Sequence, residues 1–148
     1  MFPYDQRLEP PCPRVRIRIT DRNRSISFLF AALVDTGADQ TCVPESVGGG
    51  NPNISYDICT VWGEPREMIR IPSAYVELMD EEDNVLFASE YKDLKLPVMG
   101  EELAESVQRR KEVIGYIGRD LLNSHVCQFT GRSLSWHIAE GNPHDKGL

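Results

Sequence analysis

An alternating run near the N-terminus constrains the fold of this chain more than any other feature. Over residues 14–19, arginine alternates with valine or isoleucine, which is the two-residue period of a strand with one buried face. Turn-forming residues occupy 21–24, and a strongly apolar segment fills 25–34. The pattern predicts a β-hairpin whose second strand is buried and delivers Asp35 to a loop.

Most of the remaining chain also has the pattern of short strands separated by turns. Further strands are expected at residues 54–61, 68–78, 85–91 and 94–98, and a closing pair of strands at 126–138 with its turn at 130–132. Helix is expected only at 101–112 and, in a short piece, at 119–124, while the glycines of 46–53 indicate a loop. Many short strands with frequent turns predict a mainly β, barrel-like fold.

The length of 148 residues fits one domain with a real hydrophobic core. We place that domain at residues 14–138. The proline-rich segment 1–13 is expected to be irregular, and residues 139–148 to form a polar tail.

Charge and composition exclude several classes of protein. The net charge is −7, from 23 acidic and 16 basic residues, so nucleic acid is not expected as a partner. The arginines of 14–24 are expected to form a solvated strand face, with a surface for an acidic partner as the alternative. No segment has the length and apolarity of a membrane span or a signal peptide, and none of the four cysteines lies in a C-x-x-C pair. We therefore expect free thiols, an intracellular, cytoplasmic location and no membrane association.

Asp35, Thr36 and Gly37 follow the apolar strand directly. Asp-Thr-Gly could be an ordinary turn whose polar side chains satisfy backbone groups. However, a carboxylate at the end of a buried strand is costly to charge unless it is matched. The Thr36 hydroxyl both donates and accepts hydrogen bonds, and Gly37 permits close backbone approach. These are the parts needed to hold a carboxylate ready for acid–base chemistry.

Two segments together resemble the retroviral-type aspartic proteases, the retropepsins. Leu33–Asp39 resembles their active-site signature, and Ile117–Leu122 resembles their glycine-arginine turn and the short helix after it. The resemblance implies a closed β-barrel with a flap hairpin and one short C-terminal helix, paired as a two-fold homodimer. It implies peptide-bond hydrolysis, with Asp35 as the catalytic carboxylate. Thr36 would hydrogen-bond to its mate across the dimer, and Gly37 would present a backbone group to the substrate.

The resemblance also implies a substrate cleft and an ion pair. Ala38 and Asp39 would line the cleft, and Asp39 would pair with Arg119. The flap would be the hairpin at residues 54–78, with Trp62 and Gly63 at its tip. Asp120 stands where the viral enzymes often have asparagine, and the span between Asp35 and Arg119 is longer than theirs, with 101–112 as an insertion.

A single Asp-Thr-Gly implies a dimer, because this chemistry needs two carboxylates on one water molecule. One copy of the chain supplies only Asp35, so a two-fold homodimer would complete the site. An extended peptide or protein segment would bind under the flaps. The mechanism needs no metal and no organic cofactor.

Other readings of the sequence belong to different classes. The main alternative is a catalytically silent retropepsin-like module that binds peptides or assembles a complex. A protease that mainly clips itself or a fused partner is a further possibility. A cysteine protease using Cys42 would need a histidine nearby in the fold. Nucleotide binding by the glycines at residues 48–50 is not expected, because the lysine of a phosphate-binding loop is missing there.

Overall fold

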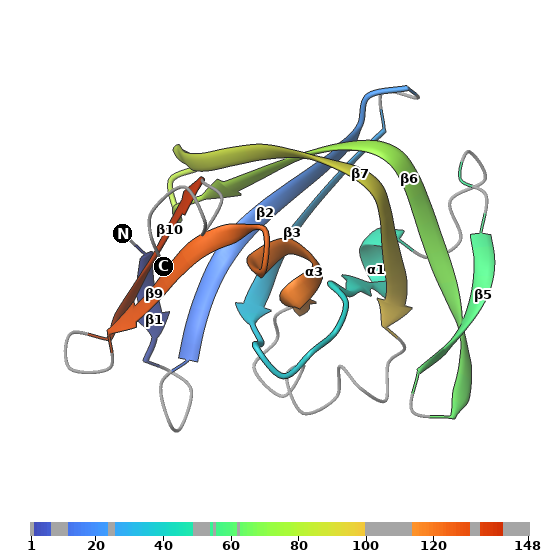
Figure 1. Ribbon diagram of the computed structural model, residues 1–148, viewed down its shortest axis with the longest axis horizontal. Helices are drawn as coiled ribbons and strands as arrows, with labels where there is room; N and C mark the ends of the chain where they lie inside the picture. The colour runs from blue at the N-terminus through green and yellow to red at the C-terminus, as the bar shows by residue number, and fades with distance from the viewer. Residues whose placement is uncertain are drawn as a thin grey trace.

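The structure is a computed structural model, and it describes residues 2–6, 12–23, 26–48, 54, 56–61, 63–99, 114–130 and 134–140. Its strands are β1 (Phe2–Asp5), β2 (Cys12–Asp21), β3 (Ile26–Val34), β4 (Val43–Pro44), β5 (Tyr56–Val61), β6 (Glu64–Met79), β7 (Val85–Met99), β8 (Ile114–Ile117), β9 (His125–Thr130) and β10 (Ser135–Glu140). Its helices are α1 (Glu45–Gly48) and α3 (Arg119–Leu122). Figure 1 shows one strongly curved sheet with both short helices on its inner side. The mainly β class expected from the sequence is confirmed.

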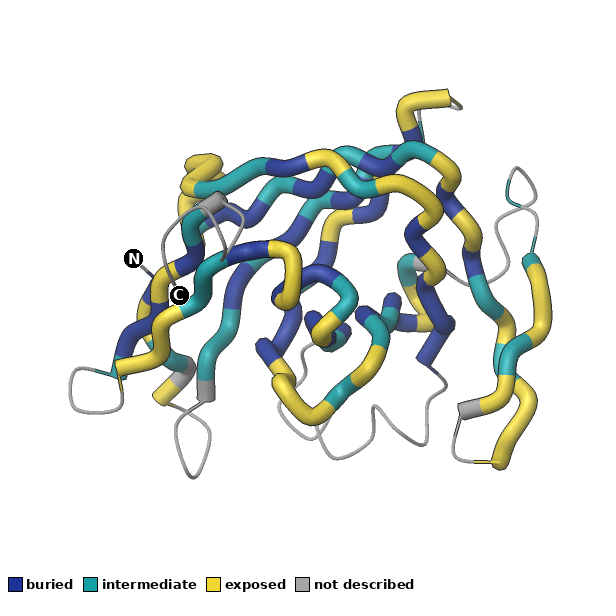
Figure 2. The backbone as a smooth tube through the Cα atoms, viewed as in Figure 1, coloured by how far each residue is buried: buried dark blue, intermediate teal, exposed yellow. Residues whose placement is uncertain are grey.

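The predicted N-terminal hairpin is the centre of this sheet. β2 pairs antiparallel with β3 along its length, and its other edge pairs with β6. The apolar side chains of β2 are buried, with Ile17 and Ile19 at 0% exposure. Figure 2 shows this alternation of buried and exposed positions along the central strands. The two-residue period of the sequence therefore identified both the strand and its buried face.

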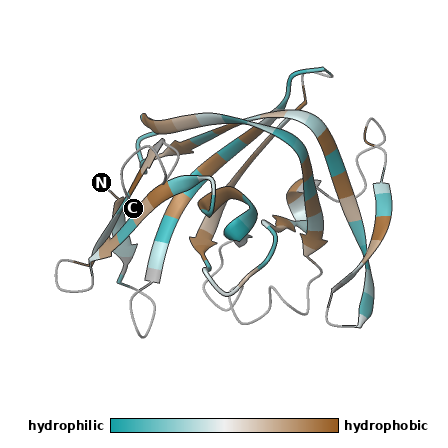
Figure 3. Cartoon of the chain, in the orientation of Figure 1, coloured by the Kyte–Doolittle hydropathy of each residue, from teal (hydrophilic) through white to brown (hydrophobic). Residues whose placement is uncertain are grey.

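The second half of β3 pairs with β2 along one edge and in parallel with β8 along the other. This pairing brings the end of β3 beside the end of β8, just before α3. The apolar ends of β3 and β7 flank the loop that follows β3, as the brown segments in Figure 3 show. Two segments far apart in the sequence, 33–41 and 116–120, thus lie side by side.

The expected closed barrel is not observed. The sheet runs in the order β4-β7-β6-β2-β1-β10-β9 and is open, with β4 and β9 at its ends. Within the described part of the chain, the short strand β4 pairs only with β7, and a single isolated bridge joins Cys42 to Tyr116 of β8. Two residues of strand provide too few backbone groups to close the barrel with a continuous ladder.

The N-terminal segment is more ordered than the sequence suggested. Phe2–Asp5 forms β1 and pairs with β10 on one side and β2 on the other. Phe2 is buried and its ring stacks on Trp136 with centroids 4.7 Å apart. The cause is a contact with a residue distant in sequence, which local proline content could not reveal.

Other boundaries also differ from expectation. The two strands expected at 85–91 and 94–98 are one strand, β7, because Lys92 and Leu94 both pair with β6 while Asp93 takes a left-handed backbone conformation (φ 56°). α1 replaces the start of the loop expected at 46–53. The expected helix 101–112 and the tail beyond residue 140 lie outside the described residues. Among the described residues, no helix is long and apolar enough to cross a membrane.

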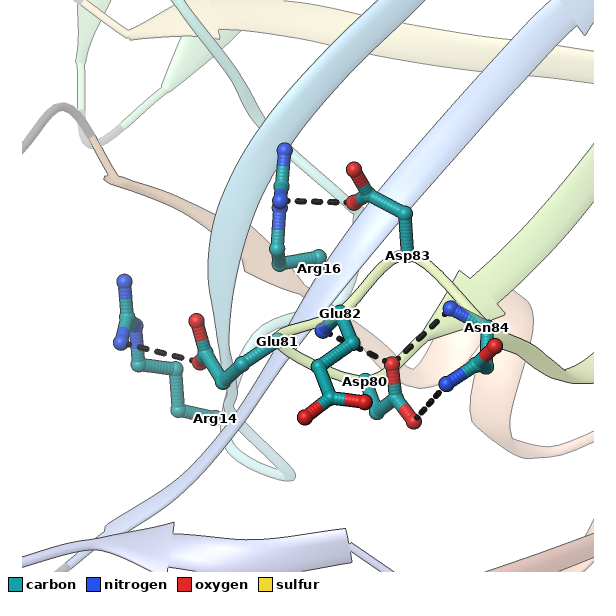
Figure 4. Close-up of polar contacts among 7 residues, drawn as sticks. All are labelled: Arg14, Arg16, Asp80, Glu81, Glu82, Asp83 and Asn84. Carbon is teal, nitrogen blue, oxygen red and sulfur yellow. Dashed lines mark hydrogen bonds and ion pairs between the residues drawn. The ribbon is translucent and has the colours of Figure 1, made fainter.

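The arginine run on β2 is neutralised within the chain. Arg14 pairs with Glu81 at 3.3 Å and Arg16 with Asp83 at 2.6 Å, both on the turn between β6 and β7, as Figure 4 shows. Arg18 pairs with Glu77 at 3.3 Å. Since these arginines have partners in the chain, this face favours the solvated-strand interpretation over an acidic partner.

Candidate active site

The position of Asp35 follows from the strand that precedes it. Val34 is buried and pairs with Ile117 of β8. The Asp35 backbone N–H then donates to the carbonyl oxygen of Ile117 at 2.9 Å. The parallel pairing of β3 with β8 therefore fixes where the chain leaves the sheet.

The Asp-Thr-Gly segment forms a tight turn around the Asp35 carboxylate. The Gly37 N–H donates to Asp35 Oδ1 at 2.9 Å, and the Ala38 N–H donates to the Asp35 carbonyl oxygen at 3.2 Å. A Cβ at Gly37 would lie 3.2 Å from Asp35 Oδ1, which is a tight contact. The Asp35 side chain is exposed in the single chain, whereas the sequence suggested an acid at the edge of a low-dielectric region. Thr36 is exposed beside it.

The first turn of α3 holds this loop from the other side. The Arg119 N–H donates to the Ala38 carbonyl oxygen at 2.9 Å, and the Asp120 N–H donates to that of Asp39 at 3.3 Å. The Arg119 guanidinium also forms an ion pair with the Asp39 carboxylate. Both side chains are largely exposed, at 47% and 82%, so the pair contributes orientation more than stability.

A second connection, which the sequence did not reveal, joins Asp120 to Thr41. The Thr41 N–H lies 3.0 Å from both Asp120 carboxylate oxygens, and the Thr41 hydroxyl donates to Oδ1 at 2.8 Å. The Thr41 oxygen accepts from the Gly118 N–H at 3.1 Å, and Thr41 is completely buried. From the sequence, Asp120 was noted only as standing where the viral enzymes often have asparagine. In the structure this carboxylate fastens the end of the Asp35 loop to α3.

Gly118 allows this close approach. A Cβ there would lie 2.6 Å from the Gln40 carbonyl carbon and 2.7 Å from its oxygen. We expect Gly118→Ala to lower the free energy of unfolding by about 1–3 kcal/mol, because the loop backbone must move to relieve the overlap. Urea denaturation of the variant checks this. The control is Ser124→Ala, a substitution at an exposed position just after α3, which should leave the free energy of unfolding nearly unchanged. Gly63→Ala is not a suitable control, because the φ of +80° at Gly63 is itself strained for alanine.

Cys42 does not have the properties of a nucleophile. Burial, and then the nearby Asp120, Cys59 and Asp35 groups, raise the pKa of its thiol to about 11. Its sulfur donates weakly to the Gln40 carbonyl oxygen at 3.7 Å. A reactive cysteine is a thiolate near neutral pH, so the structure argues against the cysteine protease interpretation.

The hairpin expected to form the flap is present as β5 and β6. Val61 pairs with Glu64 at the end of the ladder, and Gly63, between them, has a positive φ of 80° of the kind that a tight hairpin turn uses. Trp62 lies outside the described residues. Figure 1 shows the end of β5 and the start of β6 on the same lower side of the view as the loop after β3. Ile58 on β5 is 71% exposed, so the hairpin presents apolar surface in the single chain.

The structure thus brings Asp35, Gly37, Ala38, Asp39 and Arg119 into one loop-and-helix unit. In the part of the chain that the structure describes, His, Cys, Asp and Glu side chains form no group of three or more that could hold a metal ion.

Comparison with known proteins agrees with this geometry. Residues 9–63 match the model of the family described as retroviral aspartyl protease. The match includes Asp35–Gly37 and extends through β5, and it covers less than half of the chain. It confirms the resemblance inferred from the motifs. A search of curated proteins finds no match.

Proposed function

With the retroviral aspartyl protease match over residues 9–63 as the premise, we propose that this chain is an aspartic endopeptidase that hydrolyses peptide bonds as a two-fold homodimer. The observation that carries the proposal is the construction of the Asp35 turn. The Asp35 backbone N–H donates to the Ile117 carbonyl oxygen, and the Asp35 carboxylate accepts a hydrogen bond from the Gly37 N–H. Backbone N–H groups of α3 hold the two residues that follow Gly37. A carboxylate held this firmly at the surface is preorganised for reaction.

The proposed reaction uses two copies of Asp35. The ionised carboxylate removes a proton from water as the water oxygen attacks the peptide carbonyl carbon. The protonated carboxylate donates its proton to the carbonyl oxygen. As the C–N bond breaks, the Asp35 carboxyl that took the water proton gives it to the leaving nitrogen, and the other Asp35 carboxylate takes a proton back from a hydroxyl of the tetrahedral intermediate, which becomes the carboxylic acid product. As in aspartic proteases generally, two adjacent carboxylates share one proton because both cannot ionise at close range.

The second copy of the chain also explains the exposure of Asp35. A single chain holds half of the site and leaves the carboxylate in water. A partner placed by a two-fold axis would bring its Asp35 and Thr36 against the first pair. The site would then be partly desolvated, which strengthens its electrostatic interactions.

The substrate would bind as an extended strand between the active-site loops and the β5–β6 flap. Main-chain hydrogen bonds would give affinity and side-chain pockets selectivity. Ala38 and Asp39 would form the floor of the cleft, and Trp62 and Gly63 its cover. Arg119 would act through Asp39, which it orients.

The proposal is tested by incubating the chain with a mixed peptide library from acidic to neutral pH while dimer content is measured. We expect internal cleavage whose rate per chain falls about in proportion to concentration below the dimer dissociation constant. A rate per chain that stays constant far below that constant would exclude the shared site. Peptide binding without cleavage by a fully dimeric sample would favour the peptide-binding module.

A further inference from the structure

A cavity of about 430 Å³ lies beside the proposed active-site loop. One side is formed by β7 through Lys92, Asp93 and Lys95, and the other by Gln40 and Asp120. Gln40 directly follows Asp39, which lies in the proposed substrate cleft. Asp120 likewise directly follows Arg119 in the chain, so the cavity adjoins the ion pair of Asp39 with Arg119 that borders the proposed cleft.

The carboxylates around this cavity are already satisfied. Glu90 pairs with Arg22 at 3.1 Å, and Asp93 pairs with Arg70 at 2.6 Å. The oxygens of Asp120 accept hydrogen bonds from Thr41 and from the Leu121 N–H. Arginines therefore balance the charges of Glu90 and Asp93, whereas Asp120 keeps its charge and has its hydrogen bonds satisfied by neutral donors.

The two lysines of the cavity have no such partners. Lys92 and Lys95 are exposed, and neither makes an ion pair or side-chain hydrogen bond within the described part of the chain. Lys95 contributes a small attraction that lowers the pKa of Asp93, after the larger effect of Arg70. With Glu90 and Asp93 paired to arginines, the two lysines face one further carboxylate, that of Asp120, so this lining keeps one positive charge in excess on a chain of net charge −7.

We propose that this cavity is an accessory substrate site that takes an acidic side chain of the peptide segment flanking the scissile bond. The inference rests on the proposed endopeptidase function. An aspartate or glutamate entering beside Gln40 would meet the ammonium groups of Lys92 and Lys95, while the Gln40 amide can donate to the same carboxylate. The site would select substrates with an acidic residue several positions away from the cleaved bond, and would contribute to binding rather than to bond cleavage.

The experiment uses a cleavable peptide from the library, made with aspartate or asparagine at each successive flanking position. Three proteins are compared at low and high salt: the wild type, Lys92→Met/Lys95→Met, and Lys92→Arg/Lys95→Arg. We expect the wild type to prefer aspartate at one position by about threefold in kcat/KM for each lysine engaged. The preference should be carried by KM, weaken as salt rises, disappear in the methionine variant and persist in the arginine variant. Both variants should cut the asparagine peptides at the wild-type rate.

Each contrary result has a distinct meaning. If the wild type cuts aspartate and asparagine peptides equally at every position, the accessory site is wrong and the endopeptidase proposal stands. If inorganic phosphate competes as well as the acidic peptide does, the cavity is a general anion site and the substrate assignment is wrong. If no peptide is cut, the endopeptidase proposal fails. The accessory site is then tested separately by measuring how tightly dimeric Asp35→Asn binds the same labelled peptides. Tighter binding of the aspartate form would support the accessory site, and equal affinity for the aspartate and asparagine forms would overturn it.

Discussion

Asp35→Asn is expected to abolish peptide hydrolysis and to leave the fold intact. Asparagine keeps the size of the side chain and can still accept the hydrogen bond from the Gly37 N–H. It can neither take a proton from water nor share one with the partner's carboxylate, so we expect a loss of at least about 1,000-fold in kcat. Library cleavage, circular dichroism and dimer content measured on the same samples check this.

Asp83→Asn is the matched control for this change. Asp83 is an exposed acid on the turn between β6 and β7 (Figure 4), where its carboxylate pairs with Arg16. Its positive φ of 65° is one that asparagine tolerates. The control should retain full activity. Equal cleavage by wild type and Asp35→Asn would place the activity elsewhere or in a contaminant.

Asp120→Ala is expected to lower the free energy of unfolding by about 2–3 kcal/mol, because it leaves buried donors without an acceptor. The substitution removes the acceptor for the N–H and hydroxyl of Thr41 and for the Leu121 N–H. Thr41 is fully buried, so its donors cannot readily be satisfied by water. Urea denaturation measures the loss, and cleavage should fall with it because the Asp35 loop loses its attachment to α3.

Asp80→Ala tests whether the burial of Thr41 is the reason for the large loss of stability expected in Asp120→Ala. Asp80 also accepts several hydrogen bonds, from the N–H groups of Glu82 and Asn84 and from the Asn84 side chain. It lies on an exposed turn (Figure 4), where water can replace it. A smaller loss than for Asp120→Ala is therefore expected. Equal losses would mean that the Thr41 connection has no special role.

The pH dependence of the Asp120 connection has a definite sign. Burial raises the pKa of this carboxyl above 3.8, although hydrogen bonds from Thr41 oppose the shift. The folded chain therefore binds the proton more tightly than the unfolded chain, so the contribution of Asp120 to stability falls as pH rises through the raised value. Asp120→Asn is always neutral, and it should gain stability relative to wild type over that interval. If instead the wild type gained stability relative to Asp120→Asn as pH rises, the hydrogen bonds to Asp120 would outweigh its burial in setting the pKa.

The sequence anticipated the central hairpin and the Asp35 turn for a physical reason. In a strand with one buried face, each side chain reports its own environment, so the alternation from Arg14 to Ile19 specified both the strand and its orientation. The turn at Asp35 was readable because an apolar strand stops at an acid, a hydroxyl and a glycine. The end of the β5–β6 hairpin was likewise signalled by Gly63, whose observed positive φ favours glycine.

Other features depended on contacts between distant segments, which local patterns do not encode. β1 exists because Phe2 stacks on Trp136 from the other end of the chain. The sheet is open because β4 is too short to continue the ladder.

The contribution of the sequence and that of the tertiary structure can be separated most clearly at the Asp35 site. The amino-acid sequence by itself determined which acid follows the buried strand, because the polarity of neighbouring residues is sufficient to locate the end of a strand. Only the tertiary structure decided what holds the loop after that acid. The Thr41–Asp120 hydrogen bonds and the approach of Gly118 to Gln40 join residues more than 70 positions apart. Such contacts arise from the pairing of β3 with β8, and a carboxylate gains its structural role only when that pairing buries it against its donors.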